Sequence, residues 1–360
     1  MIRCTRLCLL LAFLPAFLFT GAGVSAFAAK PKDGGSSLPK DPAALLALAA
    51  QHNGLAGPGL KPWHIKAMYQ VYNAKGNVTG KGSFEEWWAS PDEYKTIFNG
   101  PRYKQQVIRN ANGTFVSGGD TFPYPEYLVQ DLYDEPVNTK LPGKGMKLHF
   151  NMEHFGKTAL ACVEEIPKGL QPTGFHSITN IFPTYCMDPA HPILLLYGSY
   201  GQTLTQLTAV ASLDGRYLVQ NAVIFDNGHE LLSVHLTQGE TASQWSPKLF
   251  LAPSDAQNEV AFSKAQFKDA KVIAGYRISG QPPDYPESAK IGNVQGKVVL
   301  RVLIGRDGVV RSLVILSAPS ISLATSAVGA VKTWKYKPYL LGGRPVRVVT
   351  IIKVTYSLGI

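Results

Sequence analysis

The sequence predicts an α+β protein with two folded domains: an N-terminal curved, half-barrel-like antiparallel sheet with a few helices, and a small C-terminal β-β-α-β domain. Three observations carry this prediction. Short runs of β-branched and aromatic residues, separated by turn residues, extend from Trp63 to about Trp245. A strand-strand-helix-strand pattern follows Gln266. Between them, Pro253–Lys264 has polar and small residues with weak periodicity, which places the domain boundary there.

Composition supports two packed cores and divides the chain into segments. Of the 360 residues, 45% are hydrophobic and 17% are charged, which is typical of folded domains. We expect a signal peptide at 1–28 and a tether rich in Lys, Pro, Gly and Ser at 29–40. The large domain then occupies 41–252, a linker 253–265, and the small domain 266–360.

The first residues have the features of an export signal. Arg3 and Arg6 precede the apolar run 7–19, and Ala26–Ala28 supplies the small-x-small pattern that a signal peptidase needs. Cleavage would give a mature start at Ala29 and a periplasmic location. The alternative is an uncleaved inner-membrane anchor, because residues 7–29 carry no charge and about 20 apolar residues span a bilayer.

Local patterns define the elements of the large domain. Asp41 as N-cap, Pro42 at the first helical position and the Asn53-Gly54 stop predict a first helix, and 124–133 predicts a second. Hairpin turns are expected at 73–76, 214–215 and 226–228. Nine strands are expected, at His64–Tyr72, Gly82–Trp88, Tyr94–Phe98, Tyr103–Arg109, Thr114–Ser117, Ala159–Ile166, Ile193–Tyr197, Tyr217–Phe225 and Leu231–Thr237.

The small domain has clearer periodicity. The strand 298–304 alternates, and a turn at 305–308 joins it to 309–316 as a hairpin. A helix follows, capped by Ser320 or Ser322, and a turn at 342–343 leads into a β-branched strand from Val346 to Tyr356. One face of the helix is apolar, with Leu323, Ala327, Val331 and Trp334 in one stripe.

Two cysteines remain after signal removal, Cys162 and Cys186. An oxidising compartment makes a disulfide between them the expected state, and closing such a loop stabilises by about 3 kcal/mol in the chain-entropy model. The alternative is two separate buried thiols.

Charge is concentrated at the C-terminus. From Gln266 onward there are fourteen Lys and Arg against four acidic residues, in a chain with net charge +10. A basic module following a near-neutral one indicates an anionic or peptide partner, and nucleic acid is a poor candidate for an exported protein.

The sequence contains no catalytic set, so we expect a protein that is not an enzyme and needs no cofactor. It lacks nucleophile-elbow, phosphate-loop, dinucleotide and zinc-protease motifs. His149 and His154 lie five apart, which puts them on opposite faces of a strand, so no metal site is expected. The adjacent pairs Glu85-Glu86 and Glu164-Glu165 likewise alternate across a strand and form no carboxylate dyad.

Several C-terminal motifs occur in order over about eighty residues and together resemble the C-terminal domain of TonB. They are Pro283–Ala289, Gly296–Val302, Asp307–Gly308, Ala330–Pro338 and Gly342–Val346. The resemblance implies binding of an extended segment of an outer-membrane receptor, or of another envelope protein, as an added strand. An edge strand with unpaired N–H and C=O groups makes this physically reasonable. The implied pairing edge is Val346, Arg347, Val348, Val349, Thr350, Ile351, Ile352, Lys353 and Val354.

The same resemblance places Tyr285 in the Tyr-Pro motif at the domain entry. This side chain either lies close to the bound peptide or simply starts the first helix, while Trp334 is expected in the core. An exposed last strand equally permits a strand-exchanged homodimer. A complete TonB also has a membrane helix with a Ser/His face and a long Pro-rich spacer, and this sequence shows neither. Energy transduction is therefore not implied.

The N-terminal region resembles the half-barrel of LolA and LolB lipoprotein carriers, with a first helix, successive antiparallel strands from Trp63 and a second helix near Tyr124. This resemblance implies an alternative function, the periplasmic carriage of a lipid or lipoprotein, with the TonB-like module used for docking. Aromatic residues that can line such a cavity are Phe84, Trp87, Trp88, Tyr94 and Phe98. The alternative is an aromatic core without a ligand.

Overall fold

The computed structural model describes residues 38–55, 59–100, 103–118, 124–137, 142–143, 145–155, 157–170, 182–199, 203–226, 228–259, 276–341, 344–346 and 348–358. The expected signal peptide and most of the expected tether lie outside these ranges. Within the described residues, no helix is long and apolar enough to span a bilayer.

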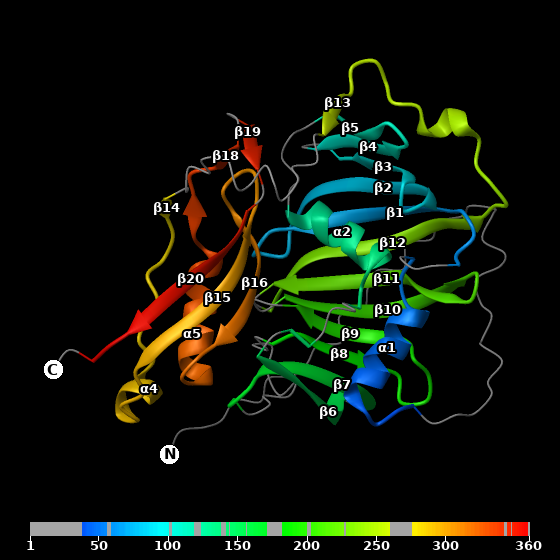
Figure 1. Ribbon diagram of the computed structural model, residues 1–360. Coiled ribbons are helices and arrows are strands. Elements are labelled where there is room, and N and C mark those ends of the chain that lie inside the picture. The colour runs from blue at the N-terminus through cyan, green and yellow to red at the C-terminus, as the bar shows by residue number, and fades with distance from the viewer. Residues whose placement is uncertain are drawn as a thin grey trace. The chain divides into compact units, whose positions relative to one another are not determined.

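In the residues that the structure describes, the large domain contains an open antiparallel sheet of thirteen strands, whose arrangement Figure 1 shows. Its spatial order is β13-β5-β4-β3-β2-β1-β12-β11-β10-β9-β8-β7-β6, so most hairpins join neighbouring strands and β1 pairs with β12. The strands are β1 Trp63–Tyr72, β2 Val78–Ser90, β3 Glu93–Asn99, β4 Lys104–Asn110, β5 Gly113–Gly118, β6 Met146–Phe155, β7 Thr158–Pro167, β8 Thr184–Met187, β9 Leu194–Ser199, β10 Thr203–Leu213, β11 Arg216–Asp226, β12 His229–Thr241 and β13 Gln257–Glu259.

All nine expected strands are present, and four more were not expected. The additional strands are β6, β8, β10 and β13. In β10 two of the buried positions are Thr203 and Thr205, which hides the alternation that marks a half-buried strand. β6 is mostly exposed, and β8 and β13 have four and three residues, too short for periodicity to show. β13 lies inside the segment that the sequence indicated as a linker, and it pairs with β5.

Two helices lie over one face of this sheet, which we call the inner face; the opposite one is the outer face (Figure 1). α1 (Pro42–His52) is capped as expected, because the Asp41 carboxylate accepts from the Ala44 N–H at 2.8 Å. It contacts β6, β7 and β11, whereas α2 (Tyr124–Asp134) contacts β11 and β12. The buried residues of α2 include Leu128, Val129 and Leu132. The helices thus supply the second layer that the inner face needs.

The disulfide expected from the sequence is present. Cys162 of β7 and Cys186 of β8 are directly opposite each other in the strand pairing, and both are buried. They pack with Leu160 and Leu196 in a small apolar cluster. The bond therefore joins two neighbouring strands near one end of the sheet order.

The small domain has the expected β-β-α-β order with short additions. Its main sheet has the order β16-β15-β20, all antiparallel. The elements are β14 Arg277–Ser279, α4 Glu287–Ile291, β15 Gly296–Ile304, β16 Val310–Ser317, α5 Ile321–Lys332, β17 Lys335–Tyr336, β18 Tyr339–Leu341, β19 Arg344–Val346 and β20 Val348–Tyr356.

The core of the small domain follows the alternation in its sequence. Val298, Leu300, Val302 and Ile304 of β15 are fully buried, as are Leu323, Ala327 and Val331 of α5, which packs on that face. The α5 N-cap is Ser320, whose hydroxyl accepts from the Leu323 N–H. Trp334 lies after the helix end, partly buried against the core, and its indole N–H donates to the Gln281 carbonyl at 2.8 Å.

Gly308 is a position where the fold requires glycine. It adopts φ +78° in the β15–β16 turn, and an added Cβ would lie 1.8 Å from the Tyr336 carbonyl oxygen. The Gly308 carbonyl in turn accepts from the Tyr336 N–H at 2.8 Å. The turn is therefore packed directly on the β17 backbone.

We predict that Gly308→Ala destabilises the protein more than a left-handed backbone alone explains. Gly215→Ala is the matched control, because Gly215 has the same φ of +78° with open space around its Cβ position. The control is expected to cost about 1 kcal/mol from backbone strain, and Gly308→Ala about 2 kcal/mol or more because strand β17 must also move. Urea denaturation followed by circular dichroism measures both. Equal losses would contradict the packing argument.

Candidate functional site

The outer edge of β20 is the first candidate site. β20 pairs with β15 on one side, and no other strand of the described chain pairs with it. Two of its side chains are large, apolar and exposed, Val349 at 63% and Ile351 at 49%. An unpaired row of backbone groups beside exposed apolar side chains has the features of an edge that accepts a further strand.

The structure places most, but not all, of the expected edge residues on this strand. Val348 to Val354 lie in β20. Val346 is instead buried in β19, where it pairs with Tyr339 of β18, because the chain completes a short hairpin before it enters the main sheet. Arg347 lies outside the described residues. The edge in the structure therefore starts at Val348, two residues later than the sequence indicated.

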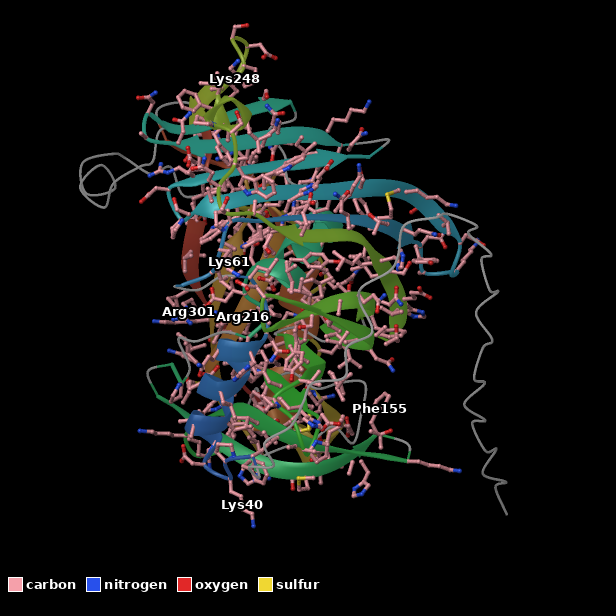
Figure 2. All side chains as sticks on the ribbon, turned by 90° about the vertical axis from the view of Figure 1, so that its right-hand side faces the viewer. Lys40, Lys61, Phe155, Arg216, Lys248 and Arg301 are labelled. Atoms are coloured by element: carbon pink, nitrogen blue, oxygen red, sulfur yellow. A yellow bond between two sulfur atoms is a disulfide. The ribbon has the colours of Figure 1, made fainter. Side chains whose placement is uncertain are left out.

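β20 divides its side chains between two faces. Val354 and Tyr356 are buried on the helix side, and Val348 and Ile352 pack against the same core. Val349, Ile351 and Lys353 lie on the other, open face, beside Leu303, Arg301 and Val299 of β15 respectively. Exposed Arg301 projects away from the ribbon (Figure 2). Among the described side chains of β15, β16 and β20, this face has cations and no carboxylate.

Tyr285 stabilises the end of the edge strand. Its hydroxyl donates to the Val294 carbonyl at 2.7 Å, and its ring meets the Tyr356 ring edge-on with centroids 5.3 Å apart. The Tyr356 hydroxyl bonds to the Ser326 hydroxyl of α5 at 3.0 Å. Tyr285 therefore has a packing role at the end of β20, and its contact with a bound peptide remains a prediction.

The expected aromatic lining of the large domain is split between the two faces. Phe84, Trp88, Tyr94 and Phe98 lie on the inner face, where Phe84 stacks on Tyr133 of α2 with centroids 5.9 Å apart. Phe84 and Phe98 are fully buried, so α2 fills the space above them. Trp87 points the other way, because neighbours along a strand alternate. Trp87 therefore lies on the outer face, contrary to the prediction that it lines an inner cavity.

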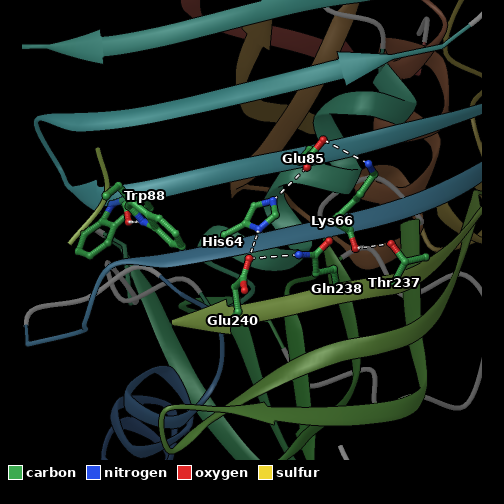
Figure 3. Close-up of polar contacts among 8 residues, drawn as sticks. His64, Lys66, Glu85, Trp88, Thr237, Gln238 and Glu240 are labelled. Carbon is green, nitrogen blue, oxygen red and sulfur yellow. Dashed lines mark hydrogen bonds and ion pairs between the residues drawn. The ribbon is translucent and has the colours of Figure 1, made fainter. Parts of the chain in front are cut away.

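On the outer face, Trp87 belongs to a cluster around His64, and Figure 3 shows the contacts of His64 with Glu85 and Glu240. The His64 and Trp87 rings stack with their centroids 4.4 Å apart, and the Trp245 ring meets the His64 ring edge-on. The His64 Nδ1 lies 2.8 Å from Glu240 of β12, and Nε2 lies 3.0 Å from Glu85 of β2. A neutral ring can donate to one carboxylate and an imidazolium to both. This cluster ties three strands together, and the sequence did not reveal it because 176 positions separate His64 from Glu240.

The inner face holds a second group of acids with different surroundings. Glu86 of β2 is buried, and burial, followed by the charge of Asp134, raises its pKa well above the ordinary value. Burial, followed by the charge of Asp131, raises the pKa of Asp134 to about 7. Burial and the charge of Glu135 raise the pKa of Asp131 to about 7 as well. Carboxyls that are desolvated and near each other favour their neutral forms.

Several buried polar atoms beside these acids have no hydrogen-bond partner in the described part of the chain. They are Glu86 Oε2, Trp63 Nε1, Thr96 Oγ1 and Tyr133 OH. Unsatisfied buried groups are uncommon in native proteins, and each needs a physical explanation. Within the same residues, no three His, Cys, Asp or Glu side chains are placed to hold a metal ion.

The small domain is a helix packed on one face of a three-stranded antiparallel sheet with an open edge. Residues 281–358 match the family model described as Gram-negative bacterial TonB protein C-terminal. This match confirms the resemblance drawn from the sequence motifs, and it covers the small domain alone. No curated protein sequence matched the chain.

Solved structures similar to the chain include three with little sequence identity. A DUF1329 family protein from Desulfovibrio piger has a TM-score of 0.40 and 11% identity, over 60% of this chain and 98% of its own. A putative outer membrane lipoprotein-sorting protein domain from Vibrio parahaemolyticus has a TM-score of 0.39 and 12% identity, over 58% of this chain and 95% of its own. A LolA superfamily protein from Nitrosomonas europaea has a TM-score of 0.38 and 9% identity, over 57% of this chain and 96% of its own.

The raised pKa values predict that stability falls as pH rises through the neutral range. Asp134 has a pKa of about 7 in the folded protein against an ordinary 3.8, so it takes up a proton on folding at any pH between these two values. Its contribution is therefore lost as pH increases through about 7. Asp134→Asn should flatten this dependence and, at pH 8, exceed the native protein in stability by about 1 kcal/mol or more.

Urea denaturation at pH 5 and pH 8 tests this, with Asp255→Asn as the control because Asp255 is exposed and lies in the turn just before β13, the terminal strand of the sheet. Identical pH dependence in the native protein and Asp134→Asn would contradict a raised carboxyl pKa.

Proposed function

We propose that this protein is a cell-envelope adaptor whose C-terminal domain captures an extended segment of an outer-membrane receptor, or of another envelope protein, as a strand added to β20. The observation that carries the proposal is the nine-residue strand β20, which is paired on one side in the described chain and matches the TonB C-terminal family. The proposed activity is binding, and the protein is not proposed to be an enzyme.

The geometry supports an added strand in two ways. Main-chain hydrogen bonds give affinity without sequence specificity, at about 1 kcal/mol net for each bond. Specificity comes from side chains that alternate across the strand. On the open face, exposed Val349 and Ile351 favour apolar partner side chains, and Arg301 and Lys353 favour acidic ones. The preferred segment is therefore extended, apolar at alternate positions, and negatively charged.

Two alternatives can be distinguished by experiment from capture of a partner segment: a homodimer formed through β20, and carriage of a lipid or lipoprotein by the large domain. A second copy of the chain paired along β20 would give a homodimer, visible by analytical ultracentrifugation as a concentration-dependent mass. Carriage of a lipid or lipoprotein by the large domain is favoured by half-buried Trp88 and Tyr94, which lie on the inner face with polar atoms that have no partner among the described residues. Lipid found by mass spectrometry in extracts of the purified protein would favour the carrier, and a clean protein would weaken it.

We predict that proline at one of two adjacent positions of β20 abolishes partner binding and leaves the fold intact. Neighbouring residues of a strand direct their N–H groups to opposite sides, so one of Ile351→Pro and Ile352→Pro removes a donor facing β15 and the other removes one facing the open edge. The variant that loses a donor to β15 should lower the free energy of unfolding of the domain by about 3 kcal/mol or more, which is enough to unfold it. The other variant should remain folded.

The partner is captured first, by a photo-reactive amino acid at position 349 in the native cell envelope, and identified by mass spectrometry. The folded proline variant carrying the same photo-reactive group should then lose the adduct, and a group at the buried position 300 should never form one. If the folded proline variant still forms the adduct, strand addition along β20 is wrong.

A further inference from the structure

A row of polar side chains crosses the inner face of the large sheet. Glu86 of β2 is directly opposite Thr96 of β3 and Ile65 of β1, and Trp63 lies on the same face two residues before Ile65. Trp63, Glu86 and Thr96 are each at least 97% buried. Each also has a side-chain polar atom with no partner in the described chain, although the three lie on neighbouring strands.

α2 contributes further polar groups to the same side of the sheet. Tyr133 stacks on Phe84, two residues from Glu86 along β2, and its hydroxyl is also buried without a hydrogen bond in the described residues. The charge of Asp134 acts on Glu86, and that of Asp131 acts on Asp134. The three carboxyls thus form one group between the helix and the sheet.

This group has acids and no counter-charge within the described residues. No Lys, Arg or His there forms an ion pair with Glu86, Asp131 or Asp134, whereas Glu85, one residue earlier, contacts both His64 and Lys66. Buried charges in proteins are normally paired, and acids without a cation hold protons instead. A cationic ligand would supply the missing charge.

We propose that this inner-face site, lined by Trp63, Glu86, Thr96 and Asp134, binds a primary ammonium group carried next to an oxygen acceptor. The ammonium group would donate to the Glu86 and Asp134 carboxylates and to the Thr96 hydroxyl oxygen. The Trp63 indole N–H would donate to the neighbouring oxygen of the ligand. The stacked Trp63 and Trp88 rings, with centroids 5.9 Å apart, provide aromatic surface that favours a cation.

Amino alcohols have this chemistry, either as free molecules or as the headgroup of a phospholipid. Binding is coupled to protons, because a carboxyl that is neutral in the empty protein must ionise to pair with an ammonium group. The carboxyl O–H bond breaks, the proton goes to the solvent, and no other covalent bond changes. The site lies in the large domain, so the proposal goes beyond strand addition and is independent of β20.

The test is a titration of the full chain with ethanolamine, followed by tryptophan fluorescence, with proton release measured by a pH indicator in weakly buffered solution. We expect saturable binding with proton release, and none with ethylene glycol, which has a hydroxyl in place of the amine. Glu86→Gln and Asp134→Asn should weaken binding about tenfold or more. Thr96→Val, which keeps the shape, should weaken it by a smaller factor, and Asp255→Asn should leave it unchanged.

The source of the amine is resolved by three further probes: phosphoethanolamine, vesicles of phosphatidylethanolamine in phosphatidylcholine, and vesicles of phosphatidylglycerol in phosphatidylcholine. Binding to the free amines supports a small-molecule ligand, and binding to phosphatidylethanolamine vesicles alone supports a lipid headgroup. The proposal is overturned if neither ethanolamine nor phosphatidylethanolamine binds, if ethylene glycol binds equally, or if Glu86→Gln and Asp255→Asn behave alike. The folded β20 proline variant should retain amine binding, so the two proposals fail separately.

Discussion

Pairing of the backbone N–H and C=O groups along open sheets is the constraint on which both domains depend. A buried strand without a neighbour leaves a row of polar groups unsatisfied, so each strand must lie beside another or meet solvent or a partner. The large domain meets this constraint by placing thirteen strands side by side, with terminal strands β13 and β6. In the described part of the small domain, the main sheet has three strands, and β20 is an edge with exposed apolar side chains.

The alternation of side chains across a strand produces the contrast at the centre of the large sheet. Glu85 and Glu86 are consecutive, yet Glu85 contacts His64 and Lys66 on the outer face, and Glu86 is buried beside Asp134 on the inner face. The same alternation separates Trp87, stacked on His64, from Trp88, stacked on Trp63. Two short sequence pairs thus supply a polar cluster with its partners on one face and, among the described residues, polar atoms without partners on the other.

Much of this fold could be predicted from sequence because its signals are local. The Asp41 cap, the alternation of 298–304 and the turn ending at Gly308 depend on residues close together in the chain, and the structure confirms each. The family motifs likewise indicated β20, although Val346 belongs to β19. The features that the sequence did not predict depend on long-range contacts. Buried Thr203 and Thr205 conceal a strand, and the environments of His64 and Glu86 depend on strands and a helix far away in sequence.

The length of β20 limits the number of partner segments that one molecule can bind in the proposed interaction. Its nine residues span about 30 Å at roughly 3.3 Å per residue, with the β18–β19 hairpin before one end and the Tyr285–Tyr356 contact at the other. An edge of this length accommodates one extended segment at a time. Each molecule would therefore bind one partner segment through this edge, so a single molecule could not join two partners by strand addition, and several suitable segments near it would compete for the same edge. Occupancy of the edge is then set by the local concentration of free segments at the membrane.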